Sequence, residues 1–334
     1  MEFSGLDLAL LHALQVDGRA PFRRIADVLG VSDQTVARRY TRLRGAGALR
    51  VVGFSDPTAV DDTQWMVRVR CAPGAGPEIA DALARRSDTS WIGLTSGGTE
   101  ITCSVRSTGG SGTDDLLLER LPHTPRVVDV SVQQVLHTFF GGAREPFAKH
   151  GVLDVEQVRR LAAHVPRPAS TAPAPKLDDV DRSLLRALRD DGRMPVEDLA
   201  RATGTSASTV RRRLQELRAG GVLYLDVDSD PGMLALPVRT QLWMSVAPQD
   251  LETAGRAVAA HLEVPFAAAT SGRTNLYAVA AHPDVATFYR YLTTSIAGLP
   301  GVTTVETSPT MRTVKLADTH YPRDRRGVPA TQRQ

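Results

Sequence analysis

The chain contains the same segment twice, and this duplication limits its fold more than any other feature of its 334 residues. When residues 7–57 are aligned with residues 181–231 without gaps, 23 of 51 positions are identical. The repeat then continues more loosely, since Thr95-Ser96-Gly97 returns as Thr270-Ser271-Gly272. Each copy is about 140 residues long, enough to bury a core of its own, so a solenoid of short repeats is excluded.

The first part of each copy has the periodicity of helices. In the first copy an apolar stripe ends at Gly18, Pro21 begins a second helix, and Ser32 is a good N-cap for a third helix that runs to about residue 46. Pro195 and Ser206 repeat the last two signals in the second copy. Three short helices are therefore expected in each copy.

The rest of each copy alternates with period two, as strands do. Trp65, Val67 and Val69 alternate in the first copy, and residues 242–246 alternate in the second. Helical stretches are expected near residues 78–86, 114–121, 251–262 and 285–297. The order strand, helix, strand, strand, helix, strand is a ferredoxin-like plan. The predicted fold class is α+β, with tandem (winged) helix-turn-helix and ferredoxin-like βαββαβ units, duplicated.

This plan divides the chain into six segments. Their predicted bounds are a helix-turn-helix domain at 1–57, a ferredoxin-like effector and assembly domain at 58–140, a helix and Pro/Ala linker at 141–176, a second helix-turn-helix domain at 177–231, a second ferredoxin-like domain at 232–316, and a flexible tail at 317–334.

Composition excludes several classes of protein. With 42% hydrophobic and 23% charged residues the chain is not disordered, and no run of about 18 apolar residues predicts a membrane span. The N-terminus has no secretory pattern, so a cytoplasmic location without a membrane partner is expected. Cys71 and Cys103 are too few for a disulfide framework or a zinc site, and we expect two buried thiols, no metal and no cofactor. The net charge of +3 predicts no particular partner.

A helix-turn-helix spacing occurs in both copies. It needs a small residue where two helices approach, a glycine in the turn, and a branched apolar residue on the next helix. These positions are Ala26, Gly30 and Val36 in the first copy and Ala200, Gly204 and Val210 in the second. One such pattern is a weak signal, but two in register, each before a Ser-capped helix, are a strong one.

The third helix of each copy has a polar face opposite its apolar one. Gln34, Arg38 and Thr41 form this face in the first copy, where Gln and Arg suit the edges of adenine and guanine. Neighbouring arginines, including Arg44 and Arg218, are placed to contact phosphates. The predicted DNA-binding residues are Ser32, Gln34, Thr35, Arg38, Arg39, Thr41, Arg42, Ser206, Ser208, Thr209, Arg211, Arg212, Arg213 and Gln215. The alternative is a solvated arginine face in a chain where only three of 40 basic residues are lysines.

These residues resemble the Lrp/AsnC family of transcriptional regulators. The resemblance rests on Leu10-Leu11, Asp17-Gly18-Arg19, Ala26, Gly30-Val31-Ser32, Thr35-Val36 and Arg38-Arg39, and on their second-copy counterparts. It implies double-stranded DNA as the partner, no catalytic residues, and ferredoxin-like parts that self-associate and sense a small-molecule effector, usually an amino acid.

Two turns of the chain, at residues 95–100 and 270–275, resemble the family's effector motif, in which Gly is followed three residues later by Asp. In this chain the acid is Glu100 in the first copy and Asn275 in the second, and Asn275 lacks the charge that would hold an ammonium group. The effector-binding residues that the resemblance implies are Gly97, Thr99, Glu100, Gly272, Thr274 and Asn275. The alternative for both segments is a tight turn that has only a structural role and binds no ligand.

Three functional alternatives remain at this point. We expect a regulator that is not an enzyme, either with its two sheets paired inside one chain or with each sheet paired with another molecule. The chain is also similar in plan to sirohaem decarboxylases, but its histidines, such as His123 and His261, do not repeat between the copies. The third alternative is an interaction module whose helices have lost DNA binding, against which Arg38 and Arg212 argue.

Overall fold

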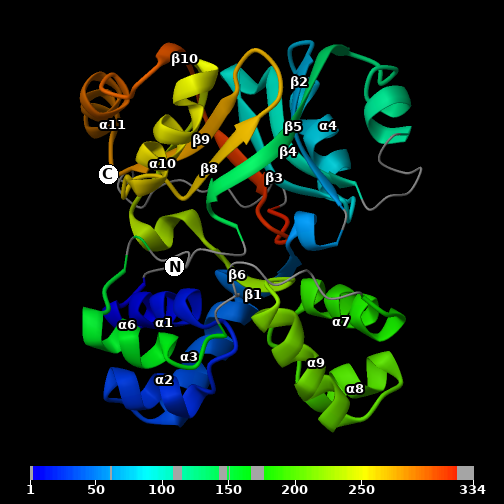
Figure 1. The fold of residues 1–334 in the computed structure, drawn as a ribbon, viewed down its shortest axis with the longest axis vertical. Coiled ribbons are helices and arrows are strands. Elements are labelled where there is room, and N and C mark those ends of the chain that lie inside the picture. Colours follow the sequence, from blue (N-terminus) through cyan, green and yellow to red (C-terminus); the bar gives the residue numbers. More distant parts are fainter. Residues whose placement is uncertain are drawn as a thin grey trace. The chain divides into compact units, whose positions relative to one another are not determined.

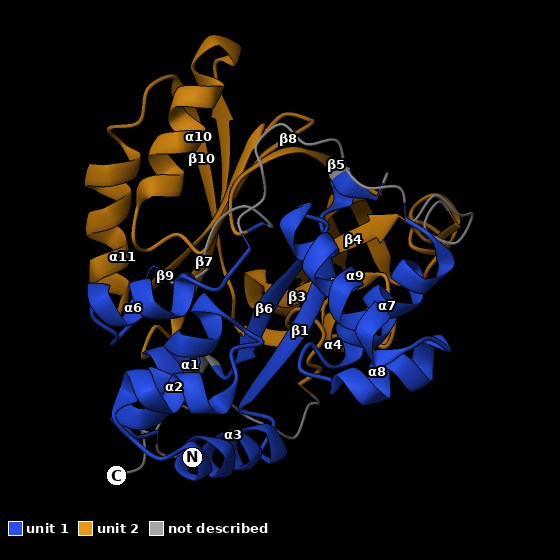
Figure 2. Ribbon diagram, turned by 60° about the horizontal axis from the view of Figure 1, so that its bottom comes forward, with its two compact units in different colours: residues 1–60, 142–234 blue, residues 61–141, 235–334 orange. Residues whose placement is uncertain are grey.

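The copies of the sequence repeat are not separate bodies in space. The computed structural model describes residues 3–60, 62–107, 115–142, 149, 151–166 and 177–321 (Figure 1). The chain divides into two compact units, each taking residues from both copies (Figure 2). Unit 1 comprises residues 1–60 and 142–234 and holds both helix-turn-helix parts. Unit 2 comprises residues 61–141 and 235–334 and holds both sheet parts. Like parts of the two copies therefore pair within one chain.

Unit 1 contains the three helices predicted for each copy. They are α1 (Gly5–Val16), α2 (Phe22–Leu29) and α3 (Asp33–Gly45), and then α7 (Asp179–Asp190), α8 (Val196–Thr203) and α9 (Ala207–Ala219). Ser32 caps α3 by accepting a hydrogen bond from the Thr35 amide, and Ser206 caps α9 in the same way. Gly30 and Gly204 end α2 and α8 at φ angles of 67° and 65°, in the left-handed region that favours glycine.

One strand follows each helix-turn-helix, and the two strands pair with each other. β1 (Leu49–Ser55) runs antiparallel to β6 (Leu223–Ser229), with Val52 opposite Asp226, in a sheet of two strands. The winged form that we predicted would need a hairpin within each copy. In the described part of unit 1 each copy instead contributes one strand to a two-stranded ribbon. In place of the predicted wing, this ribbon joins the two copies.

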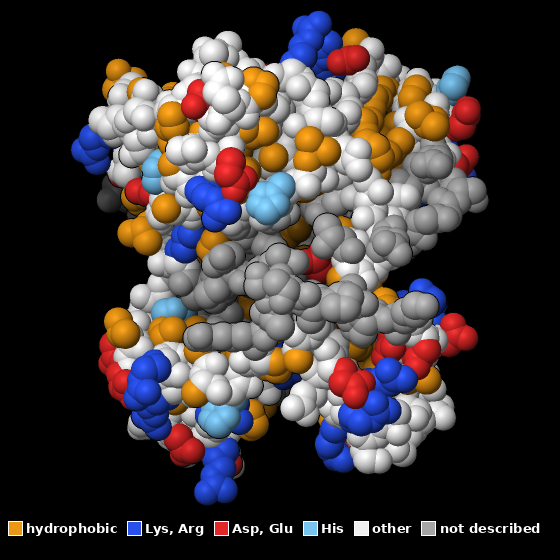
Figure 3. All heavy atoms as spheres, in the orientation of Figure 1, with side chains coloured by type: hydrophobic (Ala, Val, Ile, Leu, Met, Phe, Trp, Pro, Cys, Tyr) orange, Lys and Arg blue, Asp and Glu red, His pale blue; other side chains and the backbone are white. Residues whose placement is uncertain are grey.

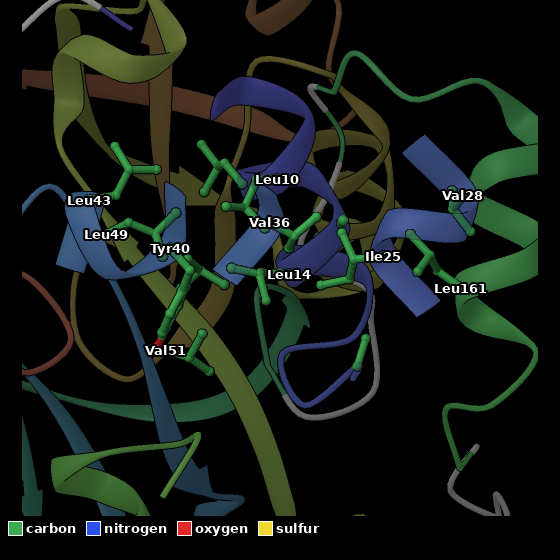
Figure 4. Close-up of a cluster of buried hydrophobic side chains, with 14 of the residues drawn as sticks. Leu10, Leu14, Ile25, Val28, Val36, Tyr40, Leu43, Leu49, Val51 and Leu161 are labelled. Carbon is green, nitrogen blue, oxygen red and sulfur yellow. The ribbon is translucent and has the colours of Figure 1, made fainter. Parts of the chain in front are cut away.

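A further helix packs against the first helix-turn-helix. This helix, α6 (Val155–Ala162), lies on α1 and α2, and Leu161 is buried beside Val28 (Figure 4). Val155 at the start of this helix is 86% exposed, so its buried side is the one that contains Leu161. The predicted linker at residues 167–176 lies outside the described residues.

Unit 2 consists of two ferredoxin-like halves. The first comprises β2 (Thr63–Cys71), α4 (Gly76–Ala84), β3 (Thr89–Thr95), β4 (Glu100–Ser107), the π-helical turn η3 (Asp115–Arg120) and β5 (Val127–Phe140). The second comprises β7 (Val238–Val246), α10 (Leu251–Ala260), β8 (Phe266–Thr270), β9 (Leu276–His282), α11 (Val285–Tyr291), the π-helical turn η6 (Leu292–Ile296), β10 (Val302–Pro309) and β11 (Arg312–Lys315). Short 3-10 turns lie at Pro57–Ala59, Ser96–Gly98, Pro231–Leu234 and Pro248–Asp250.

The two halves form one sheet in the described part of unit 2. The strand order is β10-β7-β9-β8-β5-β2-β4-β3-β11, so both halves repeat the same internal order. β5 joins them, because its first part pairs with β2 and its last part, from Val135 onward, pairs with β8. β11 also crosses between copies, since it pairs with β3. Each half has its own apolar core.

Ordered chain continues past the predicted start of the tail. Ala317 is fully buried, and His320 forms a bridge with Lys315, so the segment up to Tyr321 packs onto unit 2. The remaining tail residues, 322–334, lie outside the described part. Cys71 and Cys103 are buried free thiols. Among the described residues no helix is long and apolar enough to cross a membrane, and no cluster of metal-binding side chains occurs.

Candidate nucleic-acid interface and effector turns

The recognition helix of the first copy, α3, presents the predicted polar face to solvent. Val36, Tyr40 and Leu43 are buried in the core of unit 1, which turns the opposite side outward. Gln34, Arg38 and Thr41 are exposed on that side. Within the described part of the chain these three side chains have no hydrogen bond or ion pair, so they are free to meet a ligand.

The recognition helix of the second copy, α9, presents an equivalent face that is partly engaged. Ser208, Arg212 and Gln215 are exposed, as predicted. However, Nη1 of Arg212 lies 2.7 Å from Oε1 of Glu216, one turn further along the helix. The Ser208 hydroxyl lies 2.8 Å from that of the Ser206 cap.

Several arginines predicted to contact phosphates instead hold acids of their own domain. In the first copy Arg39 and Arg42 both reach the buried carboxylate of Asp7, at 3.0 and 2.7 Å. Asp7 completes the capping box of α1 with Ser4. Arg39 and Arg42 thereby link the recognition helix to α1. The sequence pattern did not indicate this role.

The second copy has the same arrangement with fewer cations. Arg213 lies 2.5 Å from Asp178 and 3.6 Å from Asp181, which form the capping box of α7. Arg211 pairs with Glu197 at 3.1 Å. The DNA-binding roles of these arginines stay predictions, and the structure adds a structural role to each.

The carboxylates of Asp7 and Asp181 titrate differently as a result. For Asp7, burial raises the pKa, but hydrogen bonds from the Ser4 backbone, Arg42 and Arg39 outweigh burial and lower the pKa to about 2. For Asp181, burial dominates and raises the pKa above its usual value.

Two reciprocal arginines fix the helix-turn-helix domains to each other. Arg19 donates hydrogen bonds of 2.7 and 3.0 Å to the carbonyls of Gly192 and Met194. Arg193 donates bonds of the same lengths to the carbonyls of Gly18 and Ala20. The sequence Asp-Gly-Arg occurs in both copies and contains these two arginines, so it could have indicated this joint.

Two more arginines complete the joint. Arg44 pairs with Asp191 at 2.9 Å, and Arg218 pairs with Asp17 at 3.0 Å. Both were predicted to face phosphates, yet each reaches the other copy's domain. Together with the β1–β6 ribbon they hold α3 and α9 in one compact unit, so the spacing of the two recognition helices is set within one chain.

The predicted effector turn of the first copy is closed by its own side chains. Gly97 and Gly98 take φ angles of 68° and 82° in the turn. Glu100 is only 5% exposed, because its carboxylate accepts hydrogen bonds from Arg68 at 2.6 Å and from Ser96 at 3.1 Å. The Thr99 hydroxyl donates to the Ser96 carbonyl. The predicted acid is therefore already paired with a guanidinium from its own unit.

The second turn is closed in a different way. Gly272 has a φ angle of 96°, and the side chain of Gln133 packs against it and donates to the Thr274 hydroxyl at 3.0 Å. Asn275 exchanges two hydrogen bonds with the backbone of Val246, at 2.8 and 2.9 Å. Both turns are therefore occupied by protein groups in this structure, and their effector roles stay predictions.

Comparison with protein families identifies the domain types. Residues 4–44 and 177–218 match the AsnC-type helix-turn-helix domain, and residues 241–319 match the Lrp/AsnC ligand binding domain. The first match falls in both copies, as the duplication requires.

Individual relatives are similar over shorter lengths. The chain is 36% identical over 47 residues to the HTH-type transcriptional regulator FL11 of Pyrococcus furiosus, which covers 14% of this chain and 31% of that protein. It is 37% identical over 73 residues to the regulator AldR of Mycolicibacterium smegmatis, covering 21% and 42%. An uncharacterised HTH-type regulator of Pyrococcus horikoshii is 25% identical over 134 residues, covering 40% of this chain and 85% of that protein. The chain thus spans about a third of the length of FL11.

A solved structure of similar architecture corrects one prediction. The sirohaem decarboxylase NirDL superimposes with a TM-score of 0.63 at 13% identity, covering 96% of this chain and 95% of that one. It has also been solved in complex with an iron-uroporphyrin III analogue. The prediction that the chain is not an enzyme is contradicted by this match, because an enzyme has the same two-copy fold.

The family itself follows from sequence rather than from fold. AsnC-type helix-turn-helix domains occur in both copies, an Lrp/AsnC ligand binding domain follows the second, and the relatives named above are helix-turn-helix regulators. The chain belongs to the Lrp/AsnC family, as two fused copies of the family's unit.

Proposed function

We propose that the chain is a sequence-specific DNA-binding transcriptional regulator that recognises an operator with two dissimilar half-sites. One observation carries this proposal: unit 1 exposes two recognition helices whose outward faces hold hydrogen-bonding side chains. In helix-turn-helix proteins such faces contact base edges in the major groove. The relative FL11 is named as a helix-turn-helix regulator, which supports the same function.

The two faces differ in chemistry, so the half-sites should differ in sequence. The first face presents Gln34 and Arg38, which suit adenine and guanine. The second presents Ser208, Arg212 and Gln215. A family member that pairs two identical chains reads the same sequence twice, whereas this chain would read two.

The proposal includes a small-molecule effector but names no particular compound. The match to the Lrp/AsnC ligand binding domain supports a small molecule bound by unit 2. Since the polar groups of both predicted turns are engaged with protein partners, we infer that binding there requires Arg68 or Gln133 to move aside. Thermal shift with the free amino acids tests this, and a ligand is expected to stabilise unit 2.

Selection of bound sites from random duplex DNA tests the main proposal. The expected result is a pair of unlike half-sites at a fixed spacing, bound in a gel-shift assay by the purified chain. If the selected site were a perfect palindrome, it would contradict the proposal that the two half-sites differ in sequence. Absence of any DNA shift, together with a Soret band on adding an iron tetrapyrrole, would replace the regulator with a tetrapyrrole enzyme.

A further inference from the structure

Three basic positions of the first helix-turn-helix domain are acidic in the second, and one acidic position, Asp27, is basic there as Arg201. At the offset of 174, Arg23 and Arg24 of α2 correspond to Glu197 and Asp198 of α8. Arg42 of α3 corresponds to Glu216 of α9. The recognition arginine itself is retained in both copies, as Arg38 and Arg212.

The first two reversals lie in the opening turn of the helix before the recognition helix. In helix-turn-helix complexes this helix crosses the DNA backbone, and a helix N-terminus attracts phosphate. Arg23 is exposed there and has no partner within the described residues. At the equivalent exposed position Glu197 supplies a carboxylate, which satisfies the same positive helix end and repels phosphate.

The third reversal lies beside the base-reading face. Glu216 follows Arg212 by one turn and pairs with it at 2.7 Å, with both side chains about half exposed. Arg211 is likewise paired, with Glu197. On the face seen in Figure 3 basic and acidic side chains stand next to each other over the second-copy helices. Binding DNA through α9 therefore requires these ion pairs to open beside phosphates.

We propose that the first helix-turn-helix domain supplies most of the affinity for DNA and that the second binds DNA weakly because Glu197 and Glu216 hold arginines of its recognition helix. The inference rests on the proposed DNA-binding function and deepens it. The operator then contains one strong half-site bound by α3 and one weak half-site bound by α9. Because the two recognition helices belong to one unit, the weak contact orients the chain on the operator instead of anchoring it.

Substitutions at equivalent positions test this directly. Arg38→Ala and Arg212→Ala remove the same side chain from exposed sites, so neither is expected to disturb folding, which circular dichroism checks. On the selected operator we expect Arg38→Ala to weaken binding at least 10-fold and Arg212→Ala less than 3-fold. Equal losses would overturn the inference while leaving DNA binding itself established. If the unmodified chain binds no DNA, the proposed function fails first.

The acidic residues supply the matched second arm. Arg23→Glu and Glu197→Arg exchange opposite charges at equivalent exposed positions. Arg23→Glu should weaken binding and reduce the steepness of its salt dependence by about one phosphate contact. Glu197→Arg combined with Glu216→Gln should strengthen binding several-fold. In a footprint of this variant, the weak half-site should become protected at the same protein concentration as the strong one. Unchanged protection in that variant would contradict the role of the acids.

Discussion

The copies are joined in two places, and the joints differ in kind. In unit 1 equivalent residues make equivalent contacts, because Arg19 and Arg193 exchange the same two hydrogen bonds with the opposite copy. In unit 2 the residues at equivalent positions are unlike. The guanidinium of Arg68 lies 4.8 Å from the ring centre of Trp243, and these two residues correspond at an offset of 175.

The surroundings of this pair are unlike as well. Gln241 donates a hydrogen bond to Thr102, whereas at the equivalent place Met66 packs with Tyr277 in an apolar cluster. Two first halves would bring Arg68 against Arg68, and two second halves would lack the cation. Complementarity of this kind favours unlike partners over like ones. Unit 1 therefore keeps a symmetric joint, and unit 2 has a joint that only the two different halves can make.

The largest expected effect is at the apolar centre of the asymmetric joint. Trp243 is fully buried and packs on Tyr277, with ring centres 4.4 Å apart. Trp243→Ala should lower the free energy of unfolding of unit 2 by about 3–5 kcal/mol. The chain's three tryptophans all belong to unit 2, so fluorescence of the remaining two during urea unfolding reports on this unit alone.

The chain supplies its own control for that variant. Trp91 is 42% exposed, so Trp91→Ala should cost less than about 1 kcal/mol. If both variants cost the same small amount, the contact between the halves is not a main source of unit 2's stability.

The polar side of the same joint should give the next largest effect. Arg68 binds Glu100 and also Glu306, at 2.6 and 2.9 Å. Arg68→Gln leaves the buried Glu100 carboxylate without its cation and should cost about 3 kcal/mol. Adding Glu100→Gln should recover part of this loss, which a double-mutant cycle in urea measures. An additive double variant would mean that the two side chains are not coupled.

The symmetric joint allows a comparison within unit 1. Arg19→Ala and Arg193→Ala each remove two charge-assisted hydrogen bonds, for an expected loss of about 2–3 kcal/mol. Arg193 should cost more, by about 0.5–1 kcal/mol, because its guanidinium also lies 4.5 Å from the ring centre of Phe22 and 5.4 Å from that of Tyr40. Far-UV circular dichroism follows this helical unit, and a greater loss for Arg19 would contradict the ring contribution.

Local signals in the sequence predicted the elements well, and the pairing between copies poorly. Gly30 and Ser32 place the turn and the cap of α3 because both act within a few residues. Nothing local shows that β1 pairs with β6 or that Arg44 reaches Asp191, since those contacts depend on how distant segments dock. For the same reason no local pattern shows that Glu100 is paired: its spacing fits a turn, but Arg68, which donates to it, is 32 residues away.

The smallest predicted effect separates the two helix-turn-helix domains by pH. Asp7 and Asp181 occupy the same position of the same capping box, but Arg42 supports Asp7, whereas the equivalent Glu216 competes with Asp181 for Arg213. Because the pKa of folded Asp7 is about 2, below its usual value near 3.8, ionised Asp7 stabilises the fold above about pH 4, and this contribution is lost as the pH falls toward 2. Asp7→Asn should therefore cost about 1–2 kcal/mol at pH 7 and little at pH 2.

Asp181 should respond with the opposite sign. Burial raises its pKa, so its ionised form weakens the folded state at neutral pH. This cost shrinks as the pH falls through the raised value and is gone below the usual value near 3.8. Asp181→Asn keeps an oxygen that can still accept the capping hydrogen bond, and should leave stability at pH 7 unchanged or slightly increased. Thermal unfolding of both variants at pH 7 and at low pH, with carboxyl titration by NMR, decides the matter. Equal losses at pH 7 would mean that the two carboxylates have the same effect on the stability of their domains, and would remove one physical reason for treating the second helix-turn-helix domain as different from the first.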